Sequence, residues 1–259
     1  MLAPIAGLGL EVTRRVSELG ALARFVWEAL ASARSLTRAG RRVAFRVFAN
    51  QLWFTALQAV PLIIALSGIL SFLVISQAVR ELGRLGATEL IGTLMVVAIV
   101  RELGPLLTAL SVAGRSGTAI AAELATNRVM GEVDALEGMG IDPQHYLVLP
   151  RLGAAIVSVS SLIVLFDLVA IFSGLVAAVA NGMSTARYFD IVLRSLSFGD
   201  AGLSALKGLV FGAIIGTVPC FHGLRVRRAA TEVPIASSRA VVVSILFIFL
   251  GSAAFVAVR

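Results

Sequence analysis

Five apolar segments of this chain are each about as long as the hydrocarbon core of a lipid bilayer is thick. A helix that rises about 1.5 Å per residue needs about 20 apolar residues to cross a core of about 30 Å, and its backbone groups must bond within the helix. The segments cover residues 52–77, 90–124, 152–180, 203–221 and 240–258. The sequence therefore predicts an all-α membrane protein with five transmembrane helices.

Composition agrees with this class and excludes several kinds of site. Of the 259 residues, 58% are hydrophobic and only 14% are charged, too few charges to cover a soluble domain of this size. Cys220, His145 and His222 are the only cysteine and histidines, so a disulfide within the chain and a Cys/His metal site are excluded by count. The net charge of +7 is better explained by basic loops than by nucleic-acid binding.

Residues 1–48 mix eight arginines with scattered apolar side chains and contain no segment long enough to span a bilayer. This pattern predicts an amphipathic helix in the membrane interface, with its arginines toward anionic headgroups. A helix lying on a soluble partner is the alternative, which we rank lower because a spanning segment follows at once. The chain is thus expected to divide into an interfacial segment, 1–48, and a five-span domain, 49–259.

The distribution of basic residues predicts the orientation of the chain. In a five-span arrangement, the N-terminal segment, the block 126–151 and the loop 222–239 lie on one side, and together they hold more arginines than the opposite loops. By the positive-inside tendency, this side is cytoplasmic. We therefore expect a cytoplasmic N-terminus and a C-terminus on the opposite, periplasmic side.

The second apolar segment is interrupted by charges and a proline. Arg101 and Glu102 are expensive inside a membrane, and Pro105 cannot donate a helical hydrogen bond, so a kink or break is expected there. Arg101, Thr108 and Arg115 recur at intervals of seven, which places them on one side of a regular helix. Two interpretations stay open: the charges line a cavity, or they pair with neighbouring helices.

The polar block 126–146 contains a short amphipathic pattern near 129–139. Such a helix between two spans fits a groove on a soluble partner, and an ordinary solvated loop is the alternative. The side chains that carry the pattern are Glu132, Asp134, Leu136 and Glu137.

Asp167 lies near the middle of the third segment. An intramembrane carboxylate is a functional candidate, here for proton coupling, and a buried structural role is the equal alternative. The chain has no G-x-x-x-x-G-K-[ST], G-x-S-x-G or H-E-x-x-H motif, so we predict no catalytic residue and no bound cofactor.

Residues 99–151 carry a resemblance to a known family. They read "IVRELGPLLTALSVAGRSGTAIAAELATNRVMGEVDALEGMGIDPQHYLVLPR", which is similar to the central motif of the MlaE/YrbE permeases. The segments "GILSFLVISQAVRELGRLGATELIG" and "FDLVAIFSG" also resemble that family. The resemblance covers most of the chain beyond residue 45.

This resemblance implies the membrane subunit of an ABC transporter that moves lipids, with phospholipids as the expected cargo, between the inner and outer membranes of bacteria. It implies a homodimeric permease in the inner membrane, a separate pair of P-loop ATPase subunits that bind ATP and Mg, and an MCE-domain protein on the outer side. A secondary transporter that uses Asp167 for proton coupling, and a scaffold that only anchors partners, are the alternatives.

By the same resemblance, the segment 129–139 is the coupling helix that contacts the ATPase, through Glu132, Asp134, Leu136 and Glu137. The candidates for lining a lipid cavity are Arg101, Glu102, Thr108 and Gln77, and further polar residues within the membrane are Asp167 and Arg115. The loop at 227–241, "RRAATEVPIASSRAV", lacks the glycines common in the family, so we expect it to be stiffer and more basic.

Overall fold

The computed structural model describes residues 20–22, 24–25, 27–28, 38–227 and 229–257, and within them the chain is helical with no strand. Five helices are long and apolar enough to cross a membrane, so the predicted fold class is confirmed. They cover Ala44–Arg84, Leu90–Val129, Gln144–Ala180, Phe198–Leu224 and Glu232–Ala257. Most of the predicted interfacial segment lies outside the described residues.

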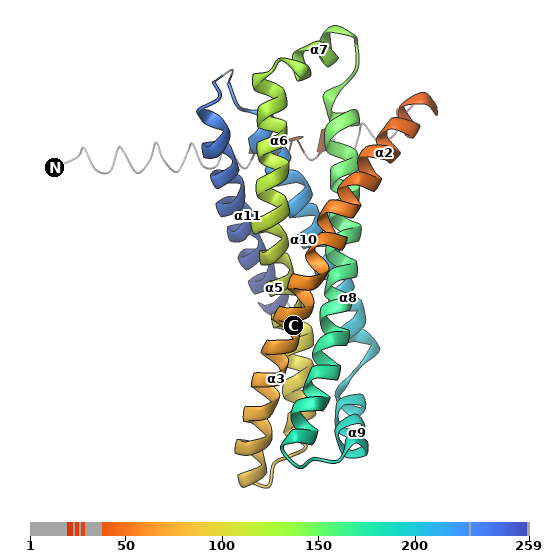
Figure 1. Ribbon diagram of the computed structural model, residues 1–259, viewed down its shortest axis with the longest axis vertical. Coiled ribbons are helices and arrows are strands. Elements are labelled where there is room, and N and C mark those ends of the chain that lie inside the picture. Colours follow the sequence, from red (N-terminus) through yellow and green to blue (C-terminus); the bar gives the residue numbers. More distant parts are fainter. Residues whose placement is uncertain (1–19, 23, 26, 29–37, 228, 258–259) are drawn as a thin grey trace, which may run out of the picture.

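The first span is longer than the predicted segment 52–77. It combines the part of α2 (Arg38–Thr55) from Ala44 onward, a single 3-10 turn, η2 (Leu57–Ala59), and α3 (Val60–Arg84). Pro61 stands at the start of α3, where its missing N–H is tolerated, and the change of helix type sets α2 at an angle to α3. Consequently α2 crosses α8 (Leu149–Ala180) obliquely, whereas α3 packs along it (Figure 1).

The second span stays helical through Pro105 by widening its turns. It runs through α4 (Leu90–Leu94), α5 (Gly104–Val112) and α6 (Thr118–Val129), with π-helical stretches η3 (Met95–Leu103) and η4 (Ala113–Gly117) between them. The Gly104 N–H donates to the Ile99 carbonyl, five residues back, so the predicted break is replaced by a π-turn.

These π-turns overturn the expectation that Arg101, Thr108 and Arg115 share one side of a helix. Each wider turn shifts the register of the residues that follow it, because a π-turn holds more residues than an α-turn. Arg101 ends up against α10 (Phe198–Leu224), whereas Arg115 contacts α2 and η2. Spacing by seven predicts a shared face only where the α-helix is uninterrupted.

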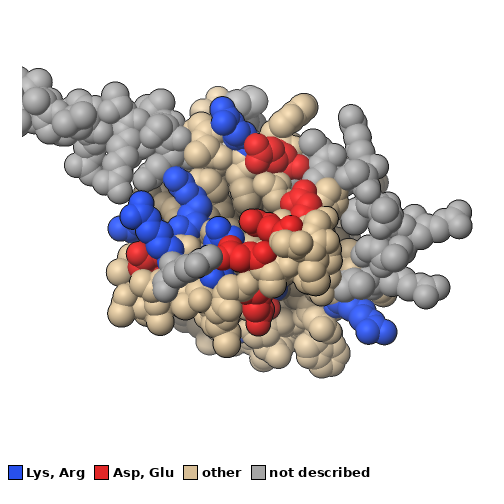
Figure 2. Space-filling view, turned by 90° about the horizontal axis from the view of Figure 1, so that it is seen from above, with Lys and Arg blue, Asp and Glu red and all other residues tan. Residues whose placement is uncertain are grey.

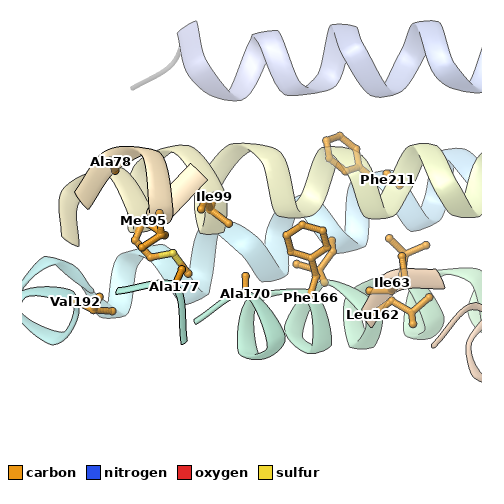
Figure 3. Close-up of a cluster of buried hydrophobic side chains, with 14 of the residues drawn as sticks. Ile63, Ala78, Met95, Ile99, Leu162, Phe166, Ala170, Ala177, Val192 and Phe211 are labelled. Atoms are coloured by element: carbon orange, nitrogen blue, oxygen red, sulfur yellow. The ribbon is translucent and has the colours of Figure 1, made fainter. Parts of the chain in front are cut away.

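Glycines allow α8 and α10 to pack closely in the centre of the bundle. A Cβ at Gly212 would lie 2.5 Å from the Ile156 Cα, and one at Gly216 would lie 2.8 Å from the Leu152 Cα. Such small-residue contacts are how helices associate in membranes, where apolar burial alone gives little preference for a partner helix. Beside this contact, Figure 3 shows apolar side chains of several helices that converge in one core, among them Ile63, Ile99, Leu162, Phe166 and Phe211.

The two ends of the bundle carry different short elements (Figure 1). At one end lie α7 (Glu132–Gly138), the π-helical η5 (Gln144–Val148) and the start of α11 (Glu232–Ala257). At the other end lies α9 (Thr185–Ser195), in the stretch between the third and fourth predicted apolar segments. It is a helix because Ser184 caps its N-terminus and its apolar side, with Tyr188 and Val192, is buried in the bundle.

Candidate functional site

Four charged side chains meet between the second and fourth spans, and we call them the η3–α10 cluster: Arg101, Glu102, Asp200 and Lys207. Arg101 forms an ion pair with Asp200. The Lys207 Nζ lies 2.8 Å from Glu102 Oε2 and donates a 2.6 Å hydrogen bond to the Arg101 carbonyl oxygen. Each charge therefore has a partner of opposite sign on the other helix, and the cluster is neutral as a whole.

Burial within the cluster is uneven. The side chains of Lys207 and Asp200 are 1% and 3% exposed, whereas those of Arg101 and Glu102 are 14% and 32% exposed. Buried charges are tolerated when they are paired, and each member of this cluster has a partner of opposite sign. The η3 half of the cluster thus remains accessible to a molecule outside the chain, while the α10 half fixes its position.

Asp200 also lies in the first turn of α10. Its Oδ2 accepts a 2.8 Å hydrogen bond from the Ser197 N–H, and the Ser197 side chain caps the same turn, which makes a capping box. The same carboxylate therefore caps the start of α10 and pairs with Arg101, which fixes the position of this helix end against η3. Of the two interpretations of Arg101 and Glu102, pairing with a neighbouring helix is observed, and contact with a lipid stays a prediction.

Sequence reasoning missed the α10 half of the cluster. Lys207 is the only lysine of the chain and lies within the apolar segment 203–221, which was a strong signal of a partnered charge. Asp200 lies between the predicted segments 152–180 and 203–221, where a capping residue and a loop residue look alike in a sequence. Only the packing of α10 against η3 shows which charges meet.

The other two cavity candidates lie in different surroundings. Thr108 is fully buried, and its hydroxyl has no hydrogen-bond partner within the described part of the chain. Gln77 is exposed on α3 and bonds to residues of its own helix: it accepts from Arg80 at 2.8 Å and donates to Glu81 at 3.5 Å. Their roles toward a lipid remain predictions.

Asp167 packs against the backbone of the second span. A Cβ at Gly104 would lie 2.8 Å from Asp167 Oδ1, so glycine is required for this approach. The Oδ1 atom is buried without a hydrogen-bond partner in the described ranges. Neither the structural nor the proton-coupling alternative is decided by this contact.

Arg115 stabilises the junction between α2 and α3. It donates to the Phe54 carbonyl at 3.1 Å and to the Gln58 side chain, and its guanidinium lies 4.8 Å from the centre of the Phe54 ring. The last carbonyls of a helix lack partners within it, and a cation there also interacts favourably with the helix dipole. Arg115 therefore holds the C-terminal end of α2 against the second span.

Charges of both signs cover the end of the bundle at α7. We call this region the α7 end and define it as residues 128–139 with Arg225 and Arg227. Figure 2 shows acidic side chains beside a group of basic ones on this face. Arg128 of α6 lies 2.8 Å from Asp134 and 3.6 Å from Glu137, so it fastens α7 to the second span.

A helix is present in the segment 129–139, where the coupling helix was predicted, and it covers Glu132–Gly138. It begins at Glu132 because Gly131 adopts a φ of +77°, which ends α6 and starts a new helix. Glu132 and Glu137 are exposed, Asp134 is half-buried, and Leu136 packs on a small core with Val133. The solvated-loop alternative is therefore wrong, and docking to a partner remains a prediction.

A cleft of about 510 Å³ separates α7 from the connection between α10 and α11. Its acidic side is Asp134, and its basic side is formed by exposed Arg225 and Arg227, with Arg128 between them. Arg225 lies over the Phe221 ring at 4.8 Å, and the Arg227 N–H donates to Glu232 at 2.7 Å. The connection is thus basic, as its sequence indicated, and bonded in place.

Five apolar spans, with a charged helix at one end, define a multi-pass membrane protein. The family described as Permease MlaE matches residues 48–258. The chain belongs to this family.

Relatives of the chain carry related names. It is 35% identical over 206 residues to a probable ABC transporter permease protein of Rickettsia typhi, covering 78% of this chain and 79% of that protein. It is 37% identical over 175 residues to the chloroplastic protein trigalactosyldiacylglycerol 1 of Arabidopsis thaliana, covering 67% and 50%. It is 29% identical over 204 residues to the intermembrane phospholipid transport system permease protein MlaE of Haemophilus influenzae, covering 78% of each chain.

Proposed function

We propose that this chain is the membrane subunit of an ABC transporter that moves phospholipids between the inner and outer membranes. Membership of the MlaE family and the name of the Haemophilus influenzae relative support this cargo. The structural observation that carries the proposal is the η3–α10 cluster, since paired charges at the edge of an apolar bundle suit a ligand with a charged head and apolar tails.

The cluster suits a headgroup because Arg101 and Glu102 keep hydrogen-bonding capacity beyond their ion pairs. Arg101 presents a guanidinium with five N–H donors, of which the bond to Asp200 uses a part, and Glu102 keeps acceptor capacity beyond its bond to Lys207. A lipid phosphate accepts from Arg101, and a lipid ammonium donates to Glu102. Lys207 and Asp200 are positioning residues in this scheme, because they hold Arg101 and Glu102 from the buried side.

The α7 end docks the ATPase in this proposal, through Glu132, Asp134, Leu136 and Glu137. The bond from Arg128 to α7 ties the docking helix to the same continuous span that carries Arg101. The 27 residues between Arg128 and Arg101 correspond to about 40 Å of helix. A displacement of α7 is thus transmitted along this span to the cluster, and the π-turns of η3 and η4 are where the span adjusts.

The remaining parts of the assembly follow from this arrangement. Arg225 and Arg227 favour a cytoplasmic α7 end, which places the N-terminus in the cytoplasm and the C-terminus in the periplasm of a bacterial inner-membrane protein. ATP and Mg are bound by a pair of P-loop ATPase subunits, and the permease works as a homodimer. An MCE-domain protein receives lipid at the α9 end.

Purification from the native membrane in mild detergent, followed by mass spectrometry of retained proteins and lipids, tests the proposal. We expect a P-loop ATPase, an MCE-domain protein and phospholipid to co-purify. A Glu102→Gln variant should retain the ATPase and lose transport of phospholipid in reconstituted vesicles. A chain that purifies alone and free of lipid would contradict the proposal.

Asp167 supports one alternative, a secondary transporter, because its buried Oδ1 lacks a partner among the described residues. In that case a proton gradient drives lipid movement without ATP, and Asp167→Asn abolishes it while ATPase activity of the complex stays normal. Transport that requires ATP and survives Asp167→Asn excludes this alternative.

A further inference from the structure

A second cleft lies between α2, α6 and α8, away from the η3–α10 cluster. Its volume is about 420 Å³. Figure 1 shows that α2 and α6 diverge toward the α7 end, with α8 behind them. The residues that line it are Val47, Asn50, Gln51, Phe54, Ala119, Ile120, Glu123 and Arg151.

The polar half of this cleft is built around a buried arginine. The Arg151 side chain is 5% exposed; it donates to Glu123 Oε1 at 2.7 Å and to the Leu147 carbonyl at 2.8 Å. Its Nε has no hydrogen-bond partner in the described part of the chain. Glu123 is 54% exposed and keeps acceptor capacity toward the cleft. The pair is neutral, and its accessible atoms belong to the carboxylate.

The cleft is polar at one end and apolar at the other, as a phospholipid molecule is. Glu123 lies six residues, about 9 Å, before the α7-side end of α6, and Arg151 lies in the first turn of α8. Toward the centre of the bundle the walls are Phe54, Ala119 and Ile120. A headgroup at the polar end therefore places its glycerol and acyl chains beside apolar side chains.

We infer that this cleft binds a zwitterionic aminophospholipid from the leaflet on the α7 side. The ammonium group donates to Glu123, and the exposed Asn50 amide donates to the phosphate. An anionic headgroup lacks the ammonium and meets a carboxylate whose cation, Arg151, is already bound to it. Arg115 lies eight residues before Glu123, about 12 Å away along the span, and is turned toward Phe54 and Gln58, so it does not reach the same headgroup.

This inference goes beyond the proposed function, because it assigns a lipid to a place that the transport proposal leaves without a role. It depends only on the chain spanning a membrane. A variant of the η3–α10 cluster, Glu102→Gln, should therefore leave lipid binding at this cleft unchanged, even if it abolishes transport.

The test is native mass spectrometry of the full-length chain in its complex, delipidated in detergent and titrated with equal amounts of phosphatidylethanolamine and phosphatidylglycerol. We expect phosphatidylethanolamine adducts to exceed phosphatidylglycerol adducts about fivefold, the size of one partly exposed ion pair. Glu123→Gln should remove this preference. The matched control is Glu89→Gln, which changes an exposed carboxylate in the connection after α3. This variant should keep the preference for phosphatidylethanolamine.

A second variant covers the case in which Glu123→Gln does not fold, since that change weakens the partner of buried Arg151. Asn50→Leu keeps the ion pair and fills the mouth of the cleft from α2, so it should reduce phosphatidylethanolamine adducts while the complex stays intact. Equal binding of the two lipids by the unmodified protein, or phosphatidylethanolamine adducts that are undiminished in an intact Asn50→Leu complex, would overturn the inference.

Discussion

The η3–α10 cluster and the α7 end contain the same kinds of charge in opposite surroundings. In the cluster, Lys207 is 1% exposed and bonded to Glu102 at 2.8 Å. At the α7 end, Arg128 and Asp134 are each 31% exposed at the same 2.8 Å separation. Equal distances therefore accompany different energies, because the Lys207 end of the first pair is shielded from water, whereas both ends of the second pair are open to it. The cluster is suited to hold helices and a ligand, and the α7 end is suited to exchange partners.

Lys207→Met is expected to have the largest effect, because it leaves Glu102 without its cation beside a buried helix contact. Breaking a buried pair costs about 3–5 kcal/mol, and we expect about 3 kcal/mol here since the Glu102 side chain is 32% exposed. The measurement is thermal unfolding of the purified protein in detergent, read by helical circular dichroism.

Two further variants make that result specific. Arg194→Gln removes an exposed pair with Asp190 at 2.9 Å, so it should cost less than about 1 kcal/mol. The double variant of Lys207→Met with Glu102→Gln removes both members of the pair and should recover part of the stability. If Lys207→Met behaves like Arg194→Gln, the cluster does not stabilise the bundle.

Charge reversal at the α7 end should act on binding and leave the fold intact. Glu132→Lys changes an exposed side chain outside the ion pairs to Arg128, and we expect the ATPase to bind about tenfold more weakly because a docking carboxylate becomes a cation. Co-purification and a titration of the ATPase onto the permease in nanodiscs measure this. Glu81→Lys, on the exposed outer part of α3, is the matched control. Unchanged ATPase binding would mean that α7 is not the docking helix.

The sequence predicted the five spans and α7 better than it predicted the cluster. Span lengths and the pattern around Leu136 depend on local residue order, which a single chain displays directly. The partners of Arg101 and Glu102 depend on how α10 packs against a π-helical stretch, and a periodicity of 3.6 residues per turn does not include π-turns. Lys207 could have been found as a lone lysine in an apolar segment, although its partner could not.

Arg128→Gln should have a smaller effect than the preceding variants: a slight loss of global stability and a local loosening of α7. It removes ion pairs to Asp134 and Glu137 that are partly exposed, so we expect a loss of at most about 1 kcal/mol in global stability. Hydrogen exchange should nevertheless rise within α7, because Arg128 is the ion-pair contact that fastens α7 to α6. Arg84→Gln, which removes an exposed pair with Glu81 on α3, is the control and should leave exchange in α7 unchanged.

A change in ionic strength should have the smallest effect, on the rate of hydrogen exchange, and this effect should differ between the α7 end and the η3–α10 cluster. At 1 M salt the screening length falls to about 3 Å, so exposed pairs weaken while pairs shielded from water do not. Raising salt from 0.1 M to 1 M should therefore speed hydrogen exchange in α7 in the unmodified protein, and less so in Arg128→Gln, which lacks the ion pairs from Arg128 to Asp134 and Glu137. Exchange around Lys207 should stay constant in both. If salt loosened the start of α10 as much as α7, the cluster would be open to water, and the difference in burial would not explain the difference in strength.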